Sequence, residues 1–525
     1  MIDPYSFLNT AHTAYFAELY DQYLISPEDV EPSWRAFFQG FEFGIEESKK
    51  ENSSFKGVEI PENILKEFKV VKLINAYRTR GHLFTKTNPV RDRRTYEPNL
   101  EIENFDLEKD DLEVVFNAGE IVGLGPTTLA NILIQLETIY CDSIGIEYMF
   151  IRTPERINWI QEKLNINSNH PNFSKDQKKQ ILRKTIEAVT FEKFLHTKYV
   201  GQKRFSLEGG ESLIPALDAL IEKAALDGVK EYVVGMAHRG RLNVLTNIFG
   251  KPVEGIFNEF DGKDYKEEVF DGDVKYHLGW TSERKTDSGL KVYMNIAPNP
   301  SHLEAVGPVV QGIARAKQEK YHPNNIENVL PIIIHGDAAI AGQGVVYEVI
   351  QMERLKGFKT GGTIHIVINN QVGFTTNYLD GRSSTYCTDV AKTTLSPVLH
   401  VNSDDIEAVV HAVTFALDYR MKFQRDVFID LLGYRKYGHN EGDEPRFTQP
   451  NLYKAISTHL NPLEIYSQKL INEGVVSNDE VQLIENNYKK ILEDKLESSK
   501  DDKSIVITPF MDYEWKGFKR VKEKT

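Results

Sequence analysis

The chain is 525 residues long, with 41% hydrophobic residues, 27% charged residues and a formal net charge of −14 at pH 7. This length allows three or four structural units of roughly 150 residues each, and the acidic balance argues against sequence-independent binding to nucleic acid. Two cysteines, Cys141 and Cys387, are too few for a disulfide framework or a multi-cysteine metal site, which suits a reducing compartment.

No apolar run approaches membrane-spanning length. The first residues lack the layout of a secretory signal or a transit peptide. We therefore expect a soluble cytoplasmic protein with neither a nucleic-acid partner nor a membrane partner.

Composition divides the chain into five regions. An aromatic-rich helical hairpin is predicted at residues 15–43, with breaks at Ser26-Pro27 and Glu31-Pro32. A charged, serine-bearing linker follows, then mostly helical sequence, then alternating strands and helices, then charged helices. The expected boundaries are 1–45 for the N-terminal helical segment, 46–60 for the linker, 61–190 for a separate helical domain, 191–450 for the α/β domain and 451–525 for a helical C-terminal extension.

Six apolar runs in the α/β region have the length and composition of strands, and helical patterns lie between them. This alternation predicts an α/β fold with a doubly wound, mainly parallel sheet. The runs are residues 232–236, 292–296, 330–334, 364–368, 398–401 and 427–432.

Polar side chains follow the third and fourth of these runs. The third ends in His335-Gly336-Asp337 and the fourth in Asn369-Asn370. Because the carboxyl ends of parallel strands meet at one edge of a sheet, Asp337 and Asn370 are expected to converge in the crevice where such folds bind ligands. Hard oxygen ligands at this place suit Mg²⁺, which usually shares its shell with phosphates. Two polar strand ends in an ordinary nucleotide-binding fold are the alternative interpretation.

Two further clusters contain histidines. Residues 235–243 place His238 and Arg239 directly after a strand, where they could recognise a carboxylate or a phosphate. A solvated basic loop is the alternative. Residues 274–279 place His277 in a loop, where a single histidine is more often structural than functional.

Two more clusters also follow strands. In residues 299–304, Ser301 could donate to a phosphate or carboxylate oxygen, or could cap a helix together with Glu304 three residues later. Residues 434–441 follow the last strand and could be a plain surface loop.

Four longer motifs accompany these five clusters. They are Trp-Arg-Ala-Phe-Phe at 34–38, Ala-Tyr-Arg-Thr-Arg-Gly-His at 76–82, Ile-Gly-Ile-Glu-Tyr-Met at 144–149 and Arg-Phe-Ser-Leu-Glu-Gly at 204–209. With them the chain resembles the thiamine-dependent dehydrogenase components of 2-oxoglutarate dehydrogenase complexes, over nearly its whole length.

The resemblance implies a role for each matching residue. Asp337, Asn370 and the backbone carbonyl of Val372 would hold Mg²⁺, and the metal would hold the diphosphate of thiamine diphosphate. His238 and His277 would be the catalytic residues that contact the 2-oxo acid and the covalent intermediates formed from it. The cofactor would be lined by Arg239, Ser301, Leu303, Ala338 and Ala339, besides Asp337 and Asn370.

The activity that the resemblance implies is oxidative decarboxylation of 2-oxoglutarate in the tricarboxylic acid cycle. The succinyl group would pass to a lipoyl group of the succinyltransferase component, and the enzyme would be a homodimer. Alternatives are a 2-oxoadipate-specific or carboligating homologue, or a catalytically silent cofactor-binding or scaffold module. A nicotinamide-dependent oxidoreductase lacks support, because Gly342-Gln343-Gly344 is not followed by the third glycine of the dinucleotide fingerprint.

Members of that family normally continue beyond the equivalent of residues 514–516. Their second α/β domain binds the aminopyrimidine ring of the cofactor and supplies an activating glutamate, and a third domain follows. Because this chain ends at Thr525, we expect either a fragment or a separate chain that completes it. The hairpin at 15–43 resembles the family's segment for docking on the succinyltransferase core, although its aromatic stripe could equally pack on this chain.

Overall fold

The computed structural model describes residues 22–30, 34–35, 38–39, 62–91, 98–263, 274–501 and 510–518. The chain divides into two compact units, Met1–Phe68 and Lys69–Thr525.

The described residues of the N-terminal unit include a small aromatic cluster. The ring centroids of Tyr23 and Phe38 lie 5.3 Å apart, and those of Trp34 and Phe38 lie 5.9 Å apart. Val30 is buried in the same cluster. These aromatic side chains therefore pack on one another. The remainder of the hairpin predicted at 15–43 lies outside the described residues.

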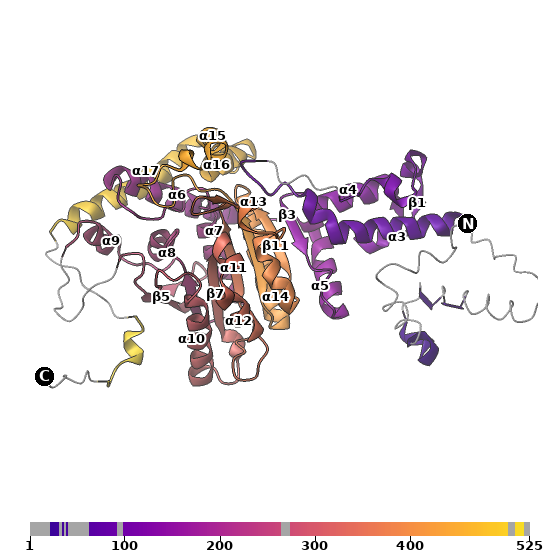
Figure 1. Cartoon of the computed structure of the whole chain (residues 1–525), viewed down its shortest axis with the longest axis horizontal. Helices are drawn as coiled ribbons and strands as arrows, with labels where there is room; N and C mark the ends of the chain where they lie inside the picture. Colours follow the sequence, from indigo (N-terminus) through magenta and orange to yellow (C-terminus); the bar gives the residue numbers. More distant parts are fainter. Residues whose placement is uncertain are drawn as a thin grey trace, which may run out of the picture. The chain divides into compact units, whose positions relative to one another are not determined.

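An eight-stranded sheet forms the centre of the second unit (Figure 1). The six inner strands pair in parallel, and the two outer strands, β3 and β5, pair antiparallel with their neighbours. The predicted doubly wound, mainly parallel α/β fold is thus confirmed. The strands in sheet order are β3 (Ile144–Glu147), β11 (Val398–Asn402), β12 (Val427–Leu432), β8 (Ile364–Asn369), β7 (Val329–Gly336), β4 (Glu231–Met236), β6 (Lys291–Ile296) and β5 (Trp280–Lys285).

Two short antiparallel pairs lie outside this sheet. They are β1 (Val115–Phe116) with β2 (Thr127–Thr128), and β9 (Val372–Gly373) with β10 (Thr376–Asn377).

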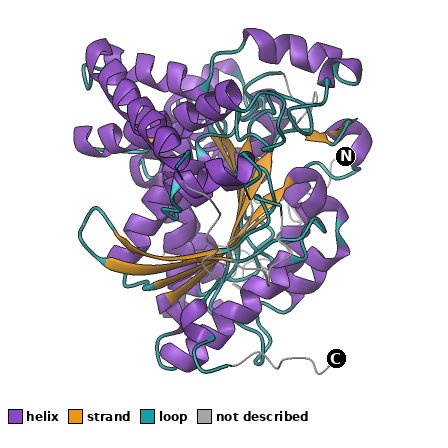
Figure 2. Cartoon of the chain, turned by 90° about the vertical axis from the view of Figure 1, so that its left-hand side faces the viewer, coloured by secondary structure: helices purple, strands orange, loops and turns teal. Residues whose placement is uncertain are grey.

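Helices surround the sheet (Figure 2). Their bounds are α3 (Glu62–Arg80), α4 (Leu129–Tyr140), α5 (Pro154–Asn165), α6 (Lys175–Lys198), α7 (Leu213–Leu226), α8 (Arg241–Asn247), α9 (Val253–Phe260), α10 (Val306–Tyr321), α11 (Asp337–Gly342), α12 (Gly344–Gln351), α13 (Tyr378–Gly381), α14 (Ile406–Phe423), α15 (Pro450–Thr458), α16 (Pro462–Asn472) and α17 (Asn478–Ser499).

Successive strand residues pack on opposite layers of helices, as the two-residue period of a strand requires. On β4, Tyr232 and Val234 join the large core that contains residues of α7 and α14, whereas Val233 packs with Val306 and Val310 of α10. The residues of β8, β11 and β12 that face the second layer pack on α12. Both faces of the inner strands are therefore covered, which is why these strands read as continuous apolar runs.

The region predicted as a separate helical domain is joined to this fold. Its strand β3 is an edge of the large sheet, and the predicted boundary between residues 190 and 191 falls inside α6. The helix continues past the boundary because Phe191, Phe194 and Leu195 extend the same buried face. The regions predicted as 61–190, 191–450 and 451–525 thus share one compact unit from Lys69 onward.

The order of the parallel strands places a reversal between β4 and β7. After β4 the chain adds β6 on one side, and it then returns to place β7 on the other side. In an open α/β sheet the carboxyl ends of strands at such a reversal border the crevice that binds ligands. The topology therefore marks the residues that follow β4 and β7 as the candidate site.

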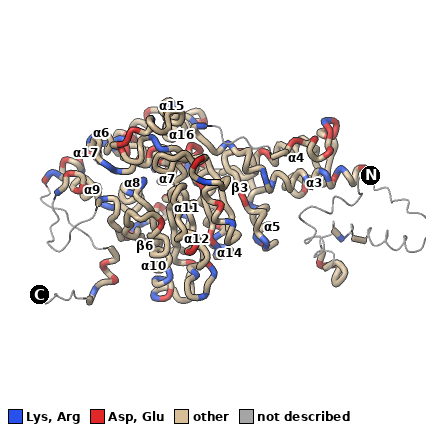
Figure 3. The backbone as a smooth tube through the Cα atoms, viewed as in Figure 1, with Lys and Arg blue, Asp and Glu red and all other residues tan. Residues whose placement is uncertain are grey.

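Acidic and basic residues are interspersed along the surface helices rather than gathered by sign (Figure 3). Among the described residues no helix combines the length and the apolar composition needed to cross a membrane.

Candidate functional site

The carboxyl ends of β4, β7 and β8 bring three segments from two of the predicted clusters to one edge of the sheet. Met236 pairs in register with Ile334, and Gly336 pairs with Ile368. Residues 238–239, 337–339 and 370–372 follow directly after these pairs. The sheet thus holds the predicted metal ligands and the predicted catalytic His238 on neighbouring strands.

Asp337 is a buried carboxylate at the first position of α11. Its oxygen Oδ2 lies 3.8 Å from Nη1 of Arg382. Burial raises the pKa of Asp337 to about 6, against the opposing effect of Arg382 and with a further rise from Asp430. A nearby divalent cation would stabilise the charged form of such a buried carboxylate.

Asn370 and Val372 belong to a tight loop after β8. The side-chain oxygen of Asn370 accepts a hydrogen bond of 3.3 Å from the backbone N–H of Val372, and Gln371 between them has a φ of +67°. The loop packs closely on α11, because a Cβ added to Gly373 would lie 2.8 Å from the Cβ of Ala338. Val372 and Asp337 are therefore held on adjoining segments.

The donor groups of Asp337, Asn370 and Val372 are of the kind that binds magnesium. A carboxylate, an amide oxygen and a backbone carbonyl are hard oxygen ligands, and waters and phosphates normally complete such a shell. Among the described residues no group of three or more His, Cys, Asp or Glu side chains could hold a metal ion. Asp337, Asn370 and the carbonyl of Val372 stay the proposed ligand set.

His238 lies in a pocket of aromatic rings. Its imidazole centroid is 4.1 Å from the ring of Phe205, 5.7 Å from His439 and 6.4 Å from Tyr276. Burial lowers the pKa of His238 to about 3, with further lowering from the charge of Arg239. His238 is therefore uncharged at neutral pH.

His277 and Ser301 lie together in the loops on either side of β5 and β6. The hydroxyl of Ser301 is 3.2 Å from Nε2 of His277, and the backbone N–H of Asn299 donates to the carbonyl of His277 over 2.9 Å. The ring of His277 also lies 5.3 Å from that of Tyr276, which contacts the His238 pocket. His277 is thus connected to His238 through one shared aromatic neighbour.

The two arginines of the cluster after β4 have different positions. Arg239 donates to the carbonyls of Ser206 over 2.9 Å and His439 over 2.8 Å, which leaves part of its guanidinium for a ligand. Arg241 is fully buried and donates to the carbonyls of Met236, Leu278 and Ala297. It ties the loops after β4 and β6 together, so the cluster is not a solvated basic loop.

The alternative of a capping box at Ser301 and Glu304 is wrong. Helix α10 begins at Val306 with Ala305 as its N-cap. Glu304 has a φ of +72°, and its carboxylate lies 2.6 Å from Nδ1 of His335 on β7. This buried tertiary contact replaces the local cap.

The other predicted cofactor-lining residues differ in exposure. Leu303 is partly exposed in the turn before α10, and Ala338 is exposed in the first turn of α11. Ala339 is only 7% exposed. Its side chain packs in the interior, and any contact of Ala339 with a cofactor would have to come from its backbone.

Sequence reasoning missed three rings of the pocket, namely Phe205, Tyr276 and His439. His439 was assigned to a possible surface loop, yet its ring lies 5.5 Å from Phe205 and 4.9 Å from Phe374. Burial lowers the pKa of His439, and the charges of Arg239 and Arg435 lower it further. The available signal was that all three lie inside segments already singled out, at 204–209, 274–279 and 434–441.

Comparison with known proteins identifies the family of the chain. The family model described as "Dehydrogenase E1 component" matches residues 183–507, and the model "2-oxoglutarate dehydrogenase N-terminus" matches residues 5–44. The chain belongs to the dehydrogenase E1 component family. The family match covers the whole parallel part of the sheet and every predicted site residue.

Three curated relatives of this E1 chain share the description "2-oxoglutarate dehydrogenase E1 component". The protein of Azotobacter vinelandii is 42% identical over 537 residues, which cover 97% of this chain and 57% of the relative. Those of Brucella canis and Brucella suis are 39% identical over 578 residues, covering 98% of this chain and 57% of each relative. The chain thus spans little more than half the length of these relatives. E1 components of this kind depend on thiamine diphosphate, normally with Mg²⁺.

Proposed function

We propose that this chain is the metal- and diphosphate-binding part of a thiamine diphosphate-dependent 2-oxoglutarate dehydrogenase. In this reaction 2-oxoglutarate is oxidatively decarboxylated and the succinyl group passes to a lipoyl group of a succinyltransferase component. The observation that carries the proposal is the buried Asp337 beside the Asn370–Val372 loop, on the sheet edge that also presents His238.

Each group of the site has a defined task in this proposal. Asp337, Asn370 and the carbonyl of Val372 would hold the magnesium ion that binds the cofactor diphosphate. When bound, thiamine diphosphate supplies the electron sink that lets a 2-oxo acid lose carbon dioxide. The protein itself positions the reactants and neutralises developing charge.

His238 and His277 would orient the substrate. An uncharged imidazole has one N–H, which can donate to a carboxylate oxygen or to an oxyanion. Arg239 and Arg435 make the surroundings of His238 and His439 cationic, and a negatively charged substrate would relieve this. The pocket chemistry therefore favours an anionic 2-oxo acid.

Several finer features belong to the same proposal. A choice of 2-oxoglutarate over 2-oxoadipate rests on one methylene, typically worth about 1 to 3 kcal/mol in a pocket. Homodimerisation, docking on the succinyltransferase core and a cytoplasmic location are proposed with it. Each relative named above is described only as the E1 component of 2-oxoglutarate dehydrogenase.

Calorimetric titration of thiamine diphosphate with and without Mg²⁺ tests the metal assignment. We expect Asp337→Ala to abolish magnesium-dependent cofactor binding, because the variant loses the charged ligand. Asp494, an exposed carboxylate on α17, gives the control, and Asp494→Ala should bind as the wild type does. Normal binding by Asp337→Ala would overturn the assignment.

Decarboxylation tests the reaction itself. The assay uses 2-oxoglutarate with an artificial electron acceptor, first on this chain alone and then with the C-terminal remainder of a relative added. We expect activity only in the second case. Cofactor binding without decarboxylation in either case would instead favour a binding or scaffold module.

A further inference from the structure

Glu441 has a carboxylate that three consecutive backbone amides bind. Its Oε2 accepts from the N–H groups of Arg204 over 2.8 Å and Phe205 over 3.2 Å, and its Oε1 accepts from the N–H of Ser206 over 2.8 Å. The side chain is 3% exposed. Charge-assisted hydrogen bonds in a dry environment hold both partners in one geometry. Glu441 therefore fixes the backbone of the turn at residues 204–206.

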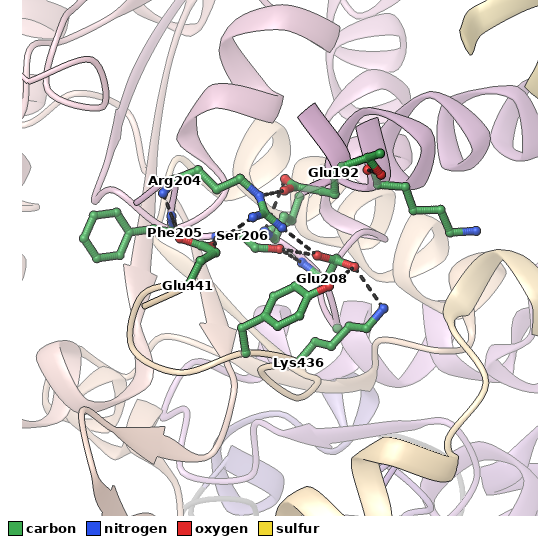
Figure 4. Close-up of polar contacts among 12 residues, drawn as sticks. Glu192, Arg204, Phe205, Ser206, Glu208, Lys436 and Glu441 are labelled. Atoms are coloured by element: carbon green, nitrogen blue, oxygen red, sulfur yellow. Dashed lines mark hydrogen bonds and ion pairs between the residues drawn. The ribbon is translucent and has the colours of Figure 1, made fainter. Parts of the chain in front are cut away.

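Arg204 anchors the same turn from the other side (Figure 4). Its guanidinium lies 3.0 Å from Glu208, 3.4 Å from Glu192 and 3.8 Å from Glu441. Lys436 adds a bond of 3.0 Å to Glu208. The turn is thus held to helix α6 and to the loop after β12 by oppositely charged groups, of which Arg204 and the glutamates are buried and Lys436 is exposed.

This turn carries Phe205, the ring closest to His238. Phe205 has a φ of +51°, a backbone conformation that costs a residue with a side chain roughly 1 to 2 kcal/mol. Such a conformation persists only where the surroundings impose it. Glu441 binds the amide of Phe205 and the amides on both sides of it, and so imposes the conformation that directs this ring at His238.

A second bridge links the same two segments. Arg239 donates to the carbonyl of Ser206 in the turn and to the carbonyl of His439, two residues before Glu441. His439 and Phe205 form two walls of the His238 pocket. Any displacement of Glu441 would therefore move both walls.

From these contacts we infer that Glu441 is a positioning residue for the proposed decarboxylation, acting through Phe205 and His439 to hold the aromatic wall beside His238. Only the expected effect on catalysis rests on the proposed function. The packing around His238 can be measured independently of any reaction.

The first test follows the protonation of His238 by NMR, with ¹³C-labelled imidazoles in the full 525-residue chain. The titration runs from pH 8 down to about pH 3, and the wild-type His238 signal should change only at the acid end, because its pKa is lowered to about 3. In Glu441→Gln we expect its titration midpoint to rise by about one pH unit or more, because the ring becomes more accessible to water and the charged form is better solvated. Glu444 lies three residues away on the surface, and Glu444→Gln should leave the His238 signal unchanged. An unchanged signal in Glu441→Gln would overturn the inference.

The second test measures the completed enzyme. Glu441→Gln should lower the decarboxylation rate by about tenfold to hundredfold, the usual effect of removing a group that supports a reacting residue. Magnesium-dependent cofactor affinity should stay within about threefold, because Asp337 and Asn370 are untouched. Equal losses of rate and cofactor affinity would indicate a general structural role and would contradict the inference. An inactive wild type would contradict the proposed function and leave the NMR result standing.

A double-mutant cycle separates positioning from unrelated damage. Phe205→Leu removes the ring itself and should reproduce the His238 shift of Glu441→Gln. Because both changes act on one contact, the double variant should show about the shift of either single variant. Additive shifts would overturn the inference. Should Glu441→Gln fail to fold, Glu441→Asp keeps the charge and is expected to show the same shift in smaller size.

Discussion

Two histidines of this molecule, His400 and His238, differ in their charged neighbours. His400, inside the sheet, is 0% exposed and lies between Asp430 at 2.8 Å and Glu147 at 3.0 Å. Burial by itself would lower the pKa of His400, but its hydrogen bonds to these carboxylates raise it. His238, at the sheet edge, has arginine and histidine neighbours, and burial and these charges lower its pKa.

The difference indicates which imidazoles are free to act. A histidine whose two ring nitrogens are hydrogen-bonded to buried carboxylates stabilises the fold and has no ring nitrogen left for a substrate. A histidine beside an arginine, with no described carboxylate in ion-pair reach, can donate a hydrogen bond to an anionic substrate. Burial acts to lower both pKa values, so the neighbouring charges make the difference.

Removal of His400 should give the largest effect. His400→Leu leaves Asp430 and Glu147 buried without their shared partner, which typically costs about 3 to 5 kcal/mol. Urea unfolding measures the loss. His170 gives the matched control, because it also pairs with a carboxylate, Asp142 at 3.0 Å, but at an exposed site. His170→Leu should cost less than about 1 kcal/mol, and equal losses for the two variants would contradict the comparison.

Removal of His238 should act on turnover instead of stability. We expect His238→Ala to raise the barrier of decarboxylation in the completed enzyme by about 2 to 5 kcal/mol, because a buried contact to a charged substrate is lost. Cofactor affinity and urea midpoint should change little, and His170→Ala should be active. A large loss of stability in His238→Ala would place His238 with His400 among the structural histidines.

The buried carboxyl group of Glu211 gives a smaller test of how burial and neighbouring charges shift a pKa. Burial and the neighbouring charge of Glu208 raise the pKa of Glu211 to about 8. Because the folded state holds the proton more tightly, stability is greatest below the ordinary pKa near 4.5 and falls as the pH rises towards 8. Glu211→Gln should therefore flatten this decline by about 1 kcal/mol between pH 5 and pH 6. Unfolding free energies of both proteins across this range check the prediction, and an unchanged slope would contradict it.

The inner strands could be predicted from sequence, and the edge strands could not. All six parallel strands were found, because both faces are buried in five of them and in the second half of β6, which produces apolar runs. β5 is half exposed and carries charged residues at 283–285, and β3 has four residues including Gly145. Neither produces a distinctive local pattern, and each exists only through pairing with a neighbour.

The residues of the site also differ in whether their positions could be predicted from the sequence. Asp337, Asn370 and His238 were placed correctly at one sheet edge because strand order and direction determine where strand ends lie. Contacts such as that of Glu441 with Phe205 join residues 236 positions apart through irregular loops. Backbone direction in such loops follows from tertiary hydrogen bonds, so no local rule predicts it.

The charged outer strand β5 has a consequence for behaviour at high concentration. The free backbone edge of a sheet is a template on which a second chain can add a strand. On β5 the exposed side chains of Glu283 and Lys285, with the 2.7 Å ion pair between Lys291 and Glu283, would have to lose water for such an addition. This end of the sheet is thereby protected against edge-to-edge aggregation.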